Sequence, residues 1–307
     1  MAQEWMVDGP RVIDVGGENE QVAIVKVALV GGRVDLVCHD DSPTARLEIQ
    51  DVQGPPLLVR WDGTTLKVSH LDDGGDDLLE KLKSRFQKGM GKMSARVSLS
   101  VPASAVVNIA TVSAGSLVNG AHNDVKVGTV SGSITLDDIH GVVKASTVSG
   151  DVEGHLLHGQ LKANTVSGAL TVQASTLDAI KLNTVSGDIT LDLVNFTADV
   201  KSTSVSGDVT VRVPPGGGYA VTARTGSGHV VIDGVAVGAS AGGSRSGTRA
   251  EGDEALTIVA NSVSGNVVVL RNRPTDATGP GADADADAGD DIQDEPFGGP
   301  LRSQDSA

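Results

Sequence analysis

The sequence predicts an all-β protein built as a single parallel β-helix (β-solenoid), with coils of about 18–21 residues and an N-terminal β cap. One observation is a repeated tetrapeptide, Thr-Val-Ser-Gly or a close variant, and the second is a short apolar strand pattern on both sides of it. A period near twenty residues is typical of solenoids, in which each repeat buries its apolar side by stacking on its neighbours. The eight copies begin at Thr111, Thr129, Thr147, Thr165, Thr184, Ser204, Thr225 and Ser262.

Residues 1–73 contain several expected strands separated by Gly, Pro and Asp turns, and no copy of the tetrapeptide. A solenoid must close the exposed edge of its first coil, because unpaired backbone groups there would pair with another chain. We therefore expect residues 1–73 to form an N-terminal β cap.

Residues 74–94 break the strand pattern and are predicted to form an amphipathic linker or short helix. Leu78, Leu82 and Phe86 recur every four residues, and basic residues lie among them. One interpretation is a helix that packs on the cap, or a solvated connector. The other is a helix that binds a membrane surface or a protein partner.

Residues 95–273 are predicted to form the β-helix repeat domain. In each coil a glycine such as Gly132 is expected to turn the chain between two strands through a positive φ angle. Two columns of apolar residues are expected to form the buried core. The first column is Val112, Val130, Val148, Val166, Val185, Val205 and Val263, and the second is Ile134, Val152, Leu170, Ile189, Val209, Val230 and Val267.

Two segments depart from the repeat. Residues 234–254 are rich in Gly, Ser and Ala and are expected to form a flexible insertion, after which the repeat register resumes. Residues 274–307 are rich in Ala, Asp and Gly and are expected to form a disordered acidic tail.

The formal net charge of the 307 residues is −15, which argues against nonspecific binding to nucleic acid. The single cysteine, Cys38, excludes an intramolecular disulfide and suits a reducing compartment. The N-terminus has no basic segment followed by an apolar one, so no signal peptide is expected. These features predict a cytoplasmic protein, and a peripheral position on the inner membrane face is compatible with them.

The copies that begin at Thr147, Thr184 and Ser204 continue as Gly-Asp followed by Ile or Val. This recurring pattern closely resembles a bacterial β-strand-repeat family of unknown function, whose members are commonly labelled "putative adhesin". The resemblance covers about residues 100–270. It implies a β-helix and a link to the bacterial cell envelope or to envelope stress, and it implies no catalytic residues.

We therefore expect a noncatalytic structural or interaction protein, linked to the bacterial envelope from the cytoplasmic side, with no cofactor. An exported, adhesin-like surface module is the alternative. A polysaccharide-processing enzyme is the third possibility, but the predicted coil loops are short and no pair of acidic residues recurs in register.

One basic residue recurs in register, three or four residues before a copy of the tetrapeptide, with apolar neighbours that place it outward. Successive coils lie about 4.8 Å apart, so these side chains are expected to form a row of like charges. One interpretation is a solvated face shielded by nearby Asp. The other is a linear site for an anionic polymer, a membrane surface or an acidic protein partner. The residues are Lys126, Lys144, Lys162, Lys181 and Lys201.

Three histidines, His122, His140 and His158, are spaced 18 residues apart and are expected to stack in a loop column. Neighbouring imidazoles can share a transition metal or form a proton-sensitive edge. Loop histidines are usually solvated, however, so no metal site is predicted. The Ser-Gly-Asp sequences lack the tandem nonapeptides of calcium-binding β-rolls, so no calcium site is predicted either.

Overall fold

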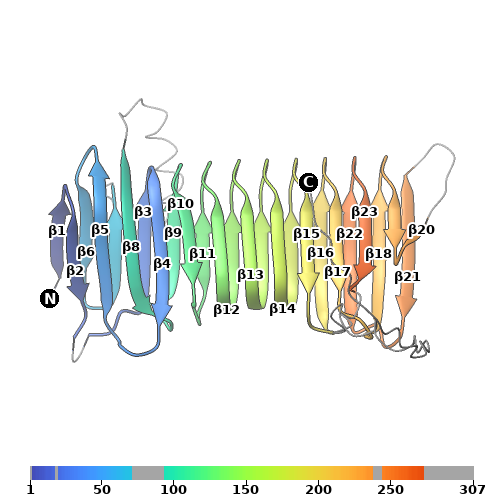
Figure 1. Ribbon diagram of the computed structural model, residues 1–307, viewed down its shortest axis with the longest axis horizontal. Coiled ribbons are helices and arrows are strands. Elements are labelled where there is room, and N and C mark those ends of the chain that lie inside the picture. The colour runs from blue at the N-terminus through green and yellow to red at the C-terminus, as the bar shows by residue number, and fades with distance from the viewer. Residues whose placement is uncertain (1, 18–19, 71–92, 238–243, 273–307) are drawn as a thin grey trace, which may run out of the picture. The chain divides into compact units, whose positions relative to one another are not determined.

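The computed structural model describes residues 2–17, 20–70, 93–237 and 244–272, and in these ranges the chain forms 23 strands and no helix (Figure 1). The described part of the chain accordingly offers no helix that could cross a membrane. The strands are β1 (Gln3–Val7), β2 (Arg11–Val15), β3 (Ile24–Leu29), β4 (Gly32–His39), β5 (Ala45–Gln53), β6 (Leu57–Trp61), β7 (Thr65–Ser69), β8 (Ser94–Pro102), β9 (Val106–Thr111), β10 (Gly115–Asn119), β11 (Val125–Gly128), β12 (Ile134–Ser146), β13 (Val152–Asn164), β14 (Leu170–Asn183), β15 (Ile189–Leu193), β16 (Ala198–Ser204), β17 (Val209–Val213), β18 (Tyr219–Thr225), β19 (Val230–Ile232), β20 (Val235–Val237), β21 (Arg245–Glu251), β22 (Leu256–Ser262) and β23 (Val267–Arg271).

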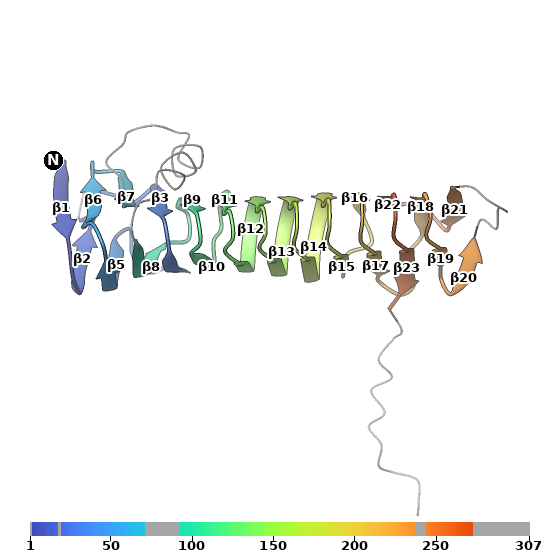
Figure 2. The ribbon, with the colours of Figure 1, turned by 90° about the horizontal axis from the view of Figure 1, so that it is seen from above.

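The strands lie in two layers that face each other (Figure 2). The long strands β12, β13 and β14 bend, so that their second halves belong to the first layer and their first halves to the second layer. The first layer has the order β1, β6, β7, β3, β9, β11, β12, β13, β14, β16, β22, β18 and β21. The second layer has the order β2, β5, β8, β4, β10, β12, β13, β14, β15, β17, β23, β19 and β20.

Each central coil consists of a second-layer strand, a bend, a first-layer strand and a Thr-Val-Ser-Gly turn. The bend falls at Asp138, Leu156 and Ala174 in three successive coils, with φ angles of 52°, 51° and 49°. Parallel pairing aligns each coil with the next, so that Val152, for example, pairs with Ile134 of the previous coil. The predicted apolar column that begins at Ile134 is buried at all of its positions, which confirms this part of the core.

The prediction that the other column is buried is wrong for most of its members. Val112 is buried and Val130 is half-buried, but the five later valines are between 37% and 58% exposed. The residue before each of them points inward instead. The exposed residues are Val148, Val166, Val185, Val205 and Val263, and the buried ones are Thr147, Thr165, Thr184, Ser204 and Ser262.

A hydrogen bond inside the turn accompanies this orientation in some of the coils. The Thr147 hydroxyl accepts the backbone N–H of Gly150 at 2.9 Å, and Thr129 makes the same contact with Gly132 at 3.0 Å. A buried N–H without a partner costs free energy, so the turn favours threonine on its inner side. Because successive side chains in an extended chain alternate, the following valine then faces solvent.

The turn glycines are required because space is limited, not because their φ angles are positive. This corrects the expectation that these glycines turn the chain through a positive φ angle. None of Gly132, Gly150 and Gly168 has a φ angle in the left-handed region. A Cβ atom on Gly150 would overlap the carbonyl oxygen of Gly132, and one on Gly168 would overlap that of Gly150. Each turn lies directly on the previous one, and only glycine leaves room for this close backbone approach.

In the two end regions, the order of the strands within each layer differs from their order along the chain. Strand β22 lies between β16 and β18, and β23 lies between β17 and β19. The last copy of the tetrapeptide therefore stacks between the sixth and seventh copies. Near the other end, β3 lies between β7 and β9, and β4 lies between β8 and β10. In both regions, a segment that is distant in sequence completes the parallel stack.

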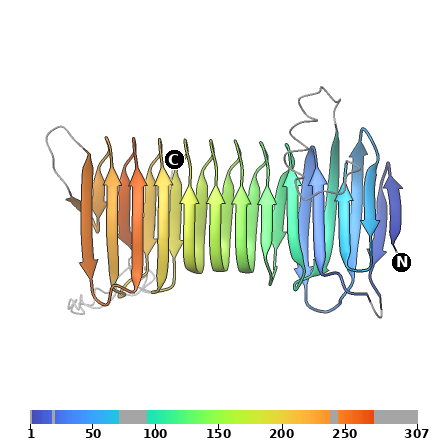
Figure 3. The same cartoon turned by 180° about the vertical axis from the view of Figure 1, so that it is seen from behind.

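Antiparallel strands end both layers (Figures 1 and 3). Strands β1 and β2 pair antiparallel with β6 and β5, and β21 and β20 pair antiparallel with β18 and β19. Residues 1–73 thus contribute both antiparallel strands and one parallel coil, β3–β4. The predicted flexible insertion at 234–254 contains β20 and β21, and its residues 238–243 lie outside the described residues.

Two further predictions fall on residues that the structure does not describe. Residues 71–92, which hold the predicted helix with Leu78, Leu82 and Phe86, lie outside the described ranges, as do residues 273–307 with the predicted acidic tail. Both remain predictions.

Candidate functional site

The five lysines lie in one row on the outer face of the first layer. Parallel pairing aligns Lys126 with Lys144, Lys144 with Lys162, Lys162 with Lys181, and Lys181 with Lys201. All five are exposed, because inward residues such as Leu161 and Ala163 flank them on their strands. We call these five residues the lysine row.

Carboxylates lie beside the two ends of the lysine row, at Asp124 and Asp199, and the strand positions beside its centre are uncharged. Lys201 forms an ion pair with Asp199, with 2.6 Å between Nζ and Oδ2. Among the described residues, no carboxylate lies within ion-pair distance of the other four lysines. The outward positions next to Lys144, Lys162 and Lys181 on their strands hold uncharged residues. These are Val142, Ser146, Gln160, Asn164, Ala179 and Asn183.

A row of exposed valines runs parallel to the lysine row, four residues further along each coil. It consists of the exposed members of the first column, and we call it the valine row. The backbone N–H of Ser167 donates to the carbonyl of Val148 at 2.7 Å, and this contact recurs from coil to coil. The valine row follows the edge where the first layer ends, so basic and apolar rows lie along the same side of the coil stack.

Sequence reasoning missed the valine row because it counted every valine of the repeat as core. One signal was present in the sequence. Every copy after the first has a hydroxyl residue three positions before a glycine, and this spacing suits a side-chain hydrogen bond to the glycine N–H. Where that contact forms, it requires the hydroxyl residue to face inward and the valine outward.

The three histidines also lie in one row, at the bend between the layers. The rings of His140 and His158 are stacked, with centroids 4.3 Å apart and an interplanar angle of 11°. His122 lies edge-on to His140 at 4.9 Å, and its Nδ1 is 3.8 Å from Oδ1 of Asp40. The stacking expected from the sequence is therefore observed.

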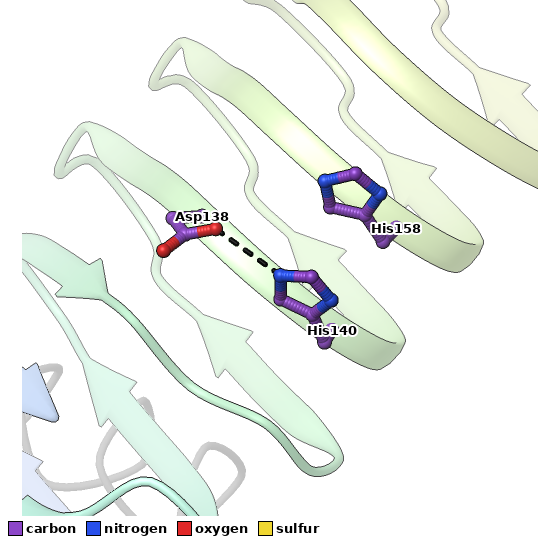
Figure 4. A group of neighbouring side chains, drawn as sticks. All are labelled: Asp138, His140 and His158. Atoms are coloured by element: carbon purple, nitrogen blue, oxygen red, sulfur yellow. Dashed lines mark hydrogen bonds and ion pairs between the residues drawn. The ribbon is translucent and has the colours of Figure 1, made fainter. Parts of the chain in front are cut away.

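Asp138 lies beside this row (Figure 4). Its Oδ1 is 3.2 Å from Nε2 of His140, and it belongs to the same strand two residues earlier. Asp138, His140 and His158 each offer a ligand atom, and these atoms lie within 4.8 Å of one another. The sequence analysis did not consider Asp138 as a ligand. An Asp-x-His pattern on a strand places both side chains on the same side, which is the signal that was missed.

A groove of about 470 Å³ crosses the outer face of the second layer. Its polar lining includes Asp137, whose carboxylate contacts Nδ2 of Asn119 at 2.8 Å and Nδ1 of His155 at 2.9 Å. Gln173 follows His155 in register. The groove is open and its polar groups already contact one another.

The Asp residues after Ser-Gly have a structural role. Oδ1 of Asp151 accepts the backbone N–H of Ala169 at 2.8 Å, and Oδ1 of Asp188 accepts that of Asp208 at 2.9 Å. Each carboxylate thus joins one coil to the next at the turn. These contacts account for the recurring aspartate.

The lone cysteine is not activated. Burial, together with the nearby Asp40, raises the pKa of Cys38 to about 12. A thiol with so high a pKa stays protonated at neutral pH and is a poor nucleophile.

Comparison with known proteins gives one family match. Residues 90–270, more than half of the chain, match the family model described as Toastrack DUF4097. This confirms the resemblance to a repeat family of unknown function that was inferred from the tetrapeptide. A search of curated proteins found no match.

Three solved structures are similar to this chain. A putative cell adhesion protein from Clostridium sporogenes is 11% identical, with a TM-score of 0.28, and the match covers 86% of this chain and 100% of that one. A putative adhesin from Bacteroides fragilis is 12% identical, with a TM-score of 0.42, and covers 85% and 97%. A putative lipid binding protein from Parabacteroides distasonis is 12% identical, with a TM-score of 0.41, and covers 86% and 97%.

Proposed function

This chain belongs to the Toastrack DUF4097 family, and we propose that it is a noncatalytic interaction protein that docks through its lysine row on the anionic inner face of the bacterial envelope. The observation that carries the proposal is the alignment of five exposed lysines on successive coils, four of them without an acidic partner among the described residues.

Electrostatics favours an anionic ligand at this row. Neighbouring coils are about 4.8 Å apart, so adjacent ammonium groups repel one another unless counter-charges lie between them. The nearby outward positions on the central coils supply no such counter-charge. An anionic surface would relieve this repulsion, and each base close to anionic lipid contributes about 1 kcal/mol to binding.

The valine row favours a lipid surface over a soluble anionic polymer. A polymer of charged groups offers no apolar surface to the exposed valines. The interfacial region of a bilayer accepts both apolar side chains and the charged heads of lysines. A basic row on the face of the first layer and an apolar row along its edge therefore fit a membrane surface with anionic lipids.

Co-sedimentation of the full chain with lipid vesicles tests the proposal. We expect binding to vesicles rich in phosphatidylglycerol at low salt, weaker binding as salt rises, and none to phosphatidylcholine vesicles. The combined substitution K144Q, K162Q and K181Q should weaken binding on the order of 100-fold, given about 1 kcal/mol per base. Failure of the wild-type chain to bind anionic vesicles would overturn the proposal.

The second layer provides a matched control. Arg33, Arg96 and Arg212 are exposed bases on that layer, and R33Q, R96Q and R212Q together remove the same formal charge. This variant should bind vesicles as the wild type does. Equal losses in the two variants would mean that net charge, rather than the lysine row, governs binding.

Two further variants separate the other candidate surfaces. V148S, V166S and V185S should weaken vesicle binding and leave any binding to soluble polyphosphate unchanged. If the wild-type chain bound polyphosphate but not vesicles, the ligand would be a soluble anionic polymer rather than a membrane. L82E with F86E tests the predicted helix, and loss of vesicle binding only in this variant would move the docking site from the lysine row to residues 74–94.

The proposed location is tested in the native cell. We expect the protein in the cytoplasmic fraction and, at low salt, with the inner membrane. Recovery from the outside of intact cells would favour an exported, adhesin-like module instead.

A further inference from the structure

The geometry at the bend points to a second site, and we propose that Asp138, His140 and His158 bind one divalent transition-metal ion, for which Zn²⁺ is the probe. The three ligand atoms already lie within 4.8 Å of one another (Figure 4). The site is separate from the lysine row and does not depend on the proposed docking function.

The backbone brings the three residues together. His140 and His158 pair in register on β12 and β13, so their side chains leave adjacent coils on the same side. Asp138 lies two residues before His140, at the position where the chain bends with a φ angle of 52°. The fold therefore fixes the three Cα positions, and only side-chain rotations remain to close the site.

Those rotations are largest for the two stacked imidazole rings, because an imidazole nitrogen binds a metal in the plane of its ring. Zn²⁺ binds imidazole nitrogen and carboxylate oxygen at about 2.0–2.2 Å, which requires ligand atoms roughly 3.3 Å apart in a tetrahedral site. The present separation of Oδ1 of Asp138 and Nε2 of His140 is already 3.2 Å. His140 and His158 must leave their stacked arrangement before both ring nitrogens face one ion. None of the three side chains is fully buried, so changes of rotamer allow this.

The ligand chemistry selects the class of metal. Two imidazoles and one carboxylate suit Zn²⁺ and neighbouring transition metals, whereas Ca²⁺ and Mg²⁺ prefer oxygen ligands. Three protein ligands leave a coordination position open to water or to a group on a partner. The edge-on contact of His122 with His140 restrains the His140 ring from the other side.

The neighbouring coils supply conservative substitutions for the test. Ala174 occupies the bend position that corresponds to Asp138 and has a φ angle of 49°, so D138A is compatible with the backbone. Thr176 pairs with His158 in register, so H158T places a residue that the fold already accepts. His155 pairs with Gln173, and H155Q removes a nearby histidine that is outside the cluster.

The experiment is a Zn²⁺ titration of the full chain, made metal-free with a chelator and carrying no polyhistidine tag. Isothermal titration calorimetry should show one Zn²⁺ per chain for the wild type. D138A and H158T should each weaken binding at least about tenfold, since even loss of an outer-shell partner of a metal ligand has that effect. H155Q should bind within about twofold of the wild type.

Thermal unfolding gives a second readout. Zn²⁺ should raise the melting temperature of the wild type and of H155Q, but not that of H158T, because only a folded site binds the metal. Absence of stoichiometric binding by the wild type would overturn the proposal. Wild-type affinity in both D138A and H158T would also overturn it. Equal weakening by H155Q would identify nonspecific binding to surface histidines.

Discussion

At the scale of single residues, the turn threonine decides which side of the tetrapeptide faces the core. Thr147 is 5% exposed, and its hydroxyl accepts the backbone N–H of Gly150 at 2.9 Å. Thr165 is equally buried one coil later, but its hydroxyl has no hydrogen-bond partner. The same residue type therefore makes the turn contact in one coil and not in the next.

This difference gives a matched pair of substitutions. Thr147→Val keeps the shape of the side chain but leaves the buried N–H of Gly150 without an acceptor. We expect the free energy of unfolding, measured with urea, to fall by about 1–3 kcal/mol.

Thr165→Val is the control, and it should change the free energy of unfolding by less than about 0.5 kcal/mol or raise it, since it removes an unpaired buried hydroxyl. Equal effects of the two substitutions would show that the hydroxyl contact of Thr147 does not stabilise the fold.

His70 is a second residue whose side chain by itself affects the stability of the fold. It is 5% exposed, and its Nδ1 accepts the backbone N–H of Val30 at 3.3 Å. Burial lowers the pKa of His70 to about 4. In the unfolded chain its pKa is close to the ordinary value of about 6.5. Below pH 6.5 the unfolded state therefore binds a proton that the folded state does not bind until about pH 4.

The folded state should consequently lose stability as the pH falls from about 6.5 to 4. The contribution of His70 is roughly 3 kcal/mol over this range, at about 1.4 kcal/mol per pKa unit. His70→Asn keeps an acceptor for the Val30 N–H and removes the titration. Urea unfolding at pH 7.5 and 4.5 should show a smaller loss of stability for this variant than for the wild type. Identical losses would mean that His70 is not protonated on unfolding in this range.

At the scale of elements, the strands β22 and β23 hold the C-terminal end together. They separate β16 and β17 from β18 and β19, which precede them in the chain. Arg271 on β23 lies 4.9 Å from the ring centroid of Tyr219 on β18 and 3.0 Å from Glu251 on β21. Tyr219 also donates a hydrogen bond to Asp233 in the turn after β19. Strands β22 and β23 thus connect the four strands β16, β17, β18 and β19.

Two truncations test this role. A chain that ends at residue 254 lacks β22 and β23, and leaves the facing edges of β16 and β18 without their partner strand. We expect it to melt at least about 10 °C lower than the full chain and to aggregate, because unpaired strand edges recruit other chains.

A chain that ends at Asn272 keeps all described strands and should melt within about 2 °C of the full chain. Circular dichroism and size-exclusion chromatography measure both outcomes. Equal melting of the two truncated chains would show that the β22–β23 coil adds no stability.

At the scale of the body formed by residues up to Asn272, the two layers differ in the arrangement of their charges. The lysine row occupies the outer face of the first layer. The outer face of the second layer carries acidic residues, among them Asp35, Asp137 and Glu153, together with the three exposed arginines of the control variant. A protein with a formal net charge of −15 can therefore still present a basic side. Such a distribution would orient the first layer toward an anionic surface and the second layer away from it.

The sequence by itself determined the fold class, the parallel alignment of the central coils and the lysine and histidine rows. These follow from a repeat with a constant period, because residues one period apart must stack when each coil pairs with the next. The buried column from Ile134 to Val267 was predictable for the same reason.

Only the tertiary structure decided the orientation of the valines, the need for glycine and the order of the end coils. Alternation alone allows either Thr147 or Val148 to face inward, and the structure places Thr147 inward, where its hydroxyl accepts a hydrogen bond from a backbone group three residues away. The requirement for Gly150 comes from the carbonyl oxygen of Gly132 in the previous coil. The position of β22 is fixed by its parallel pairing with both β16 and β18. Each of these is set by contacts between distant residues, which no local pattern contains.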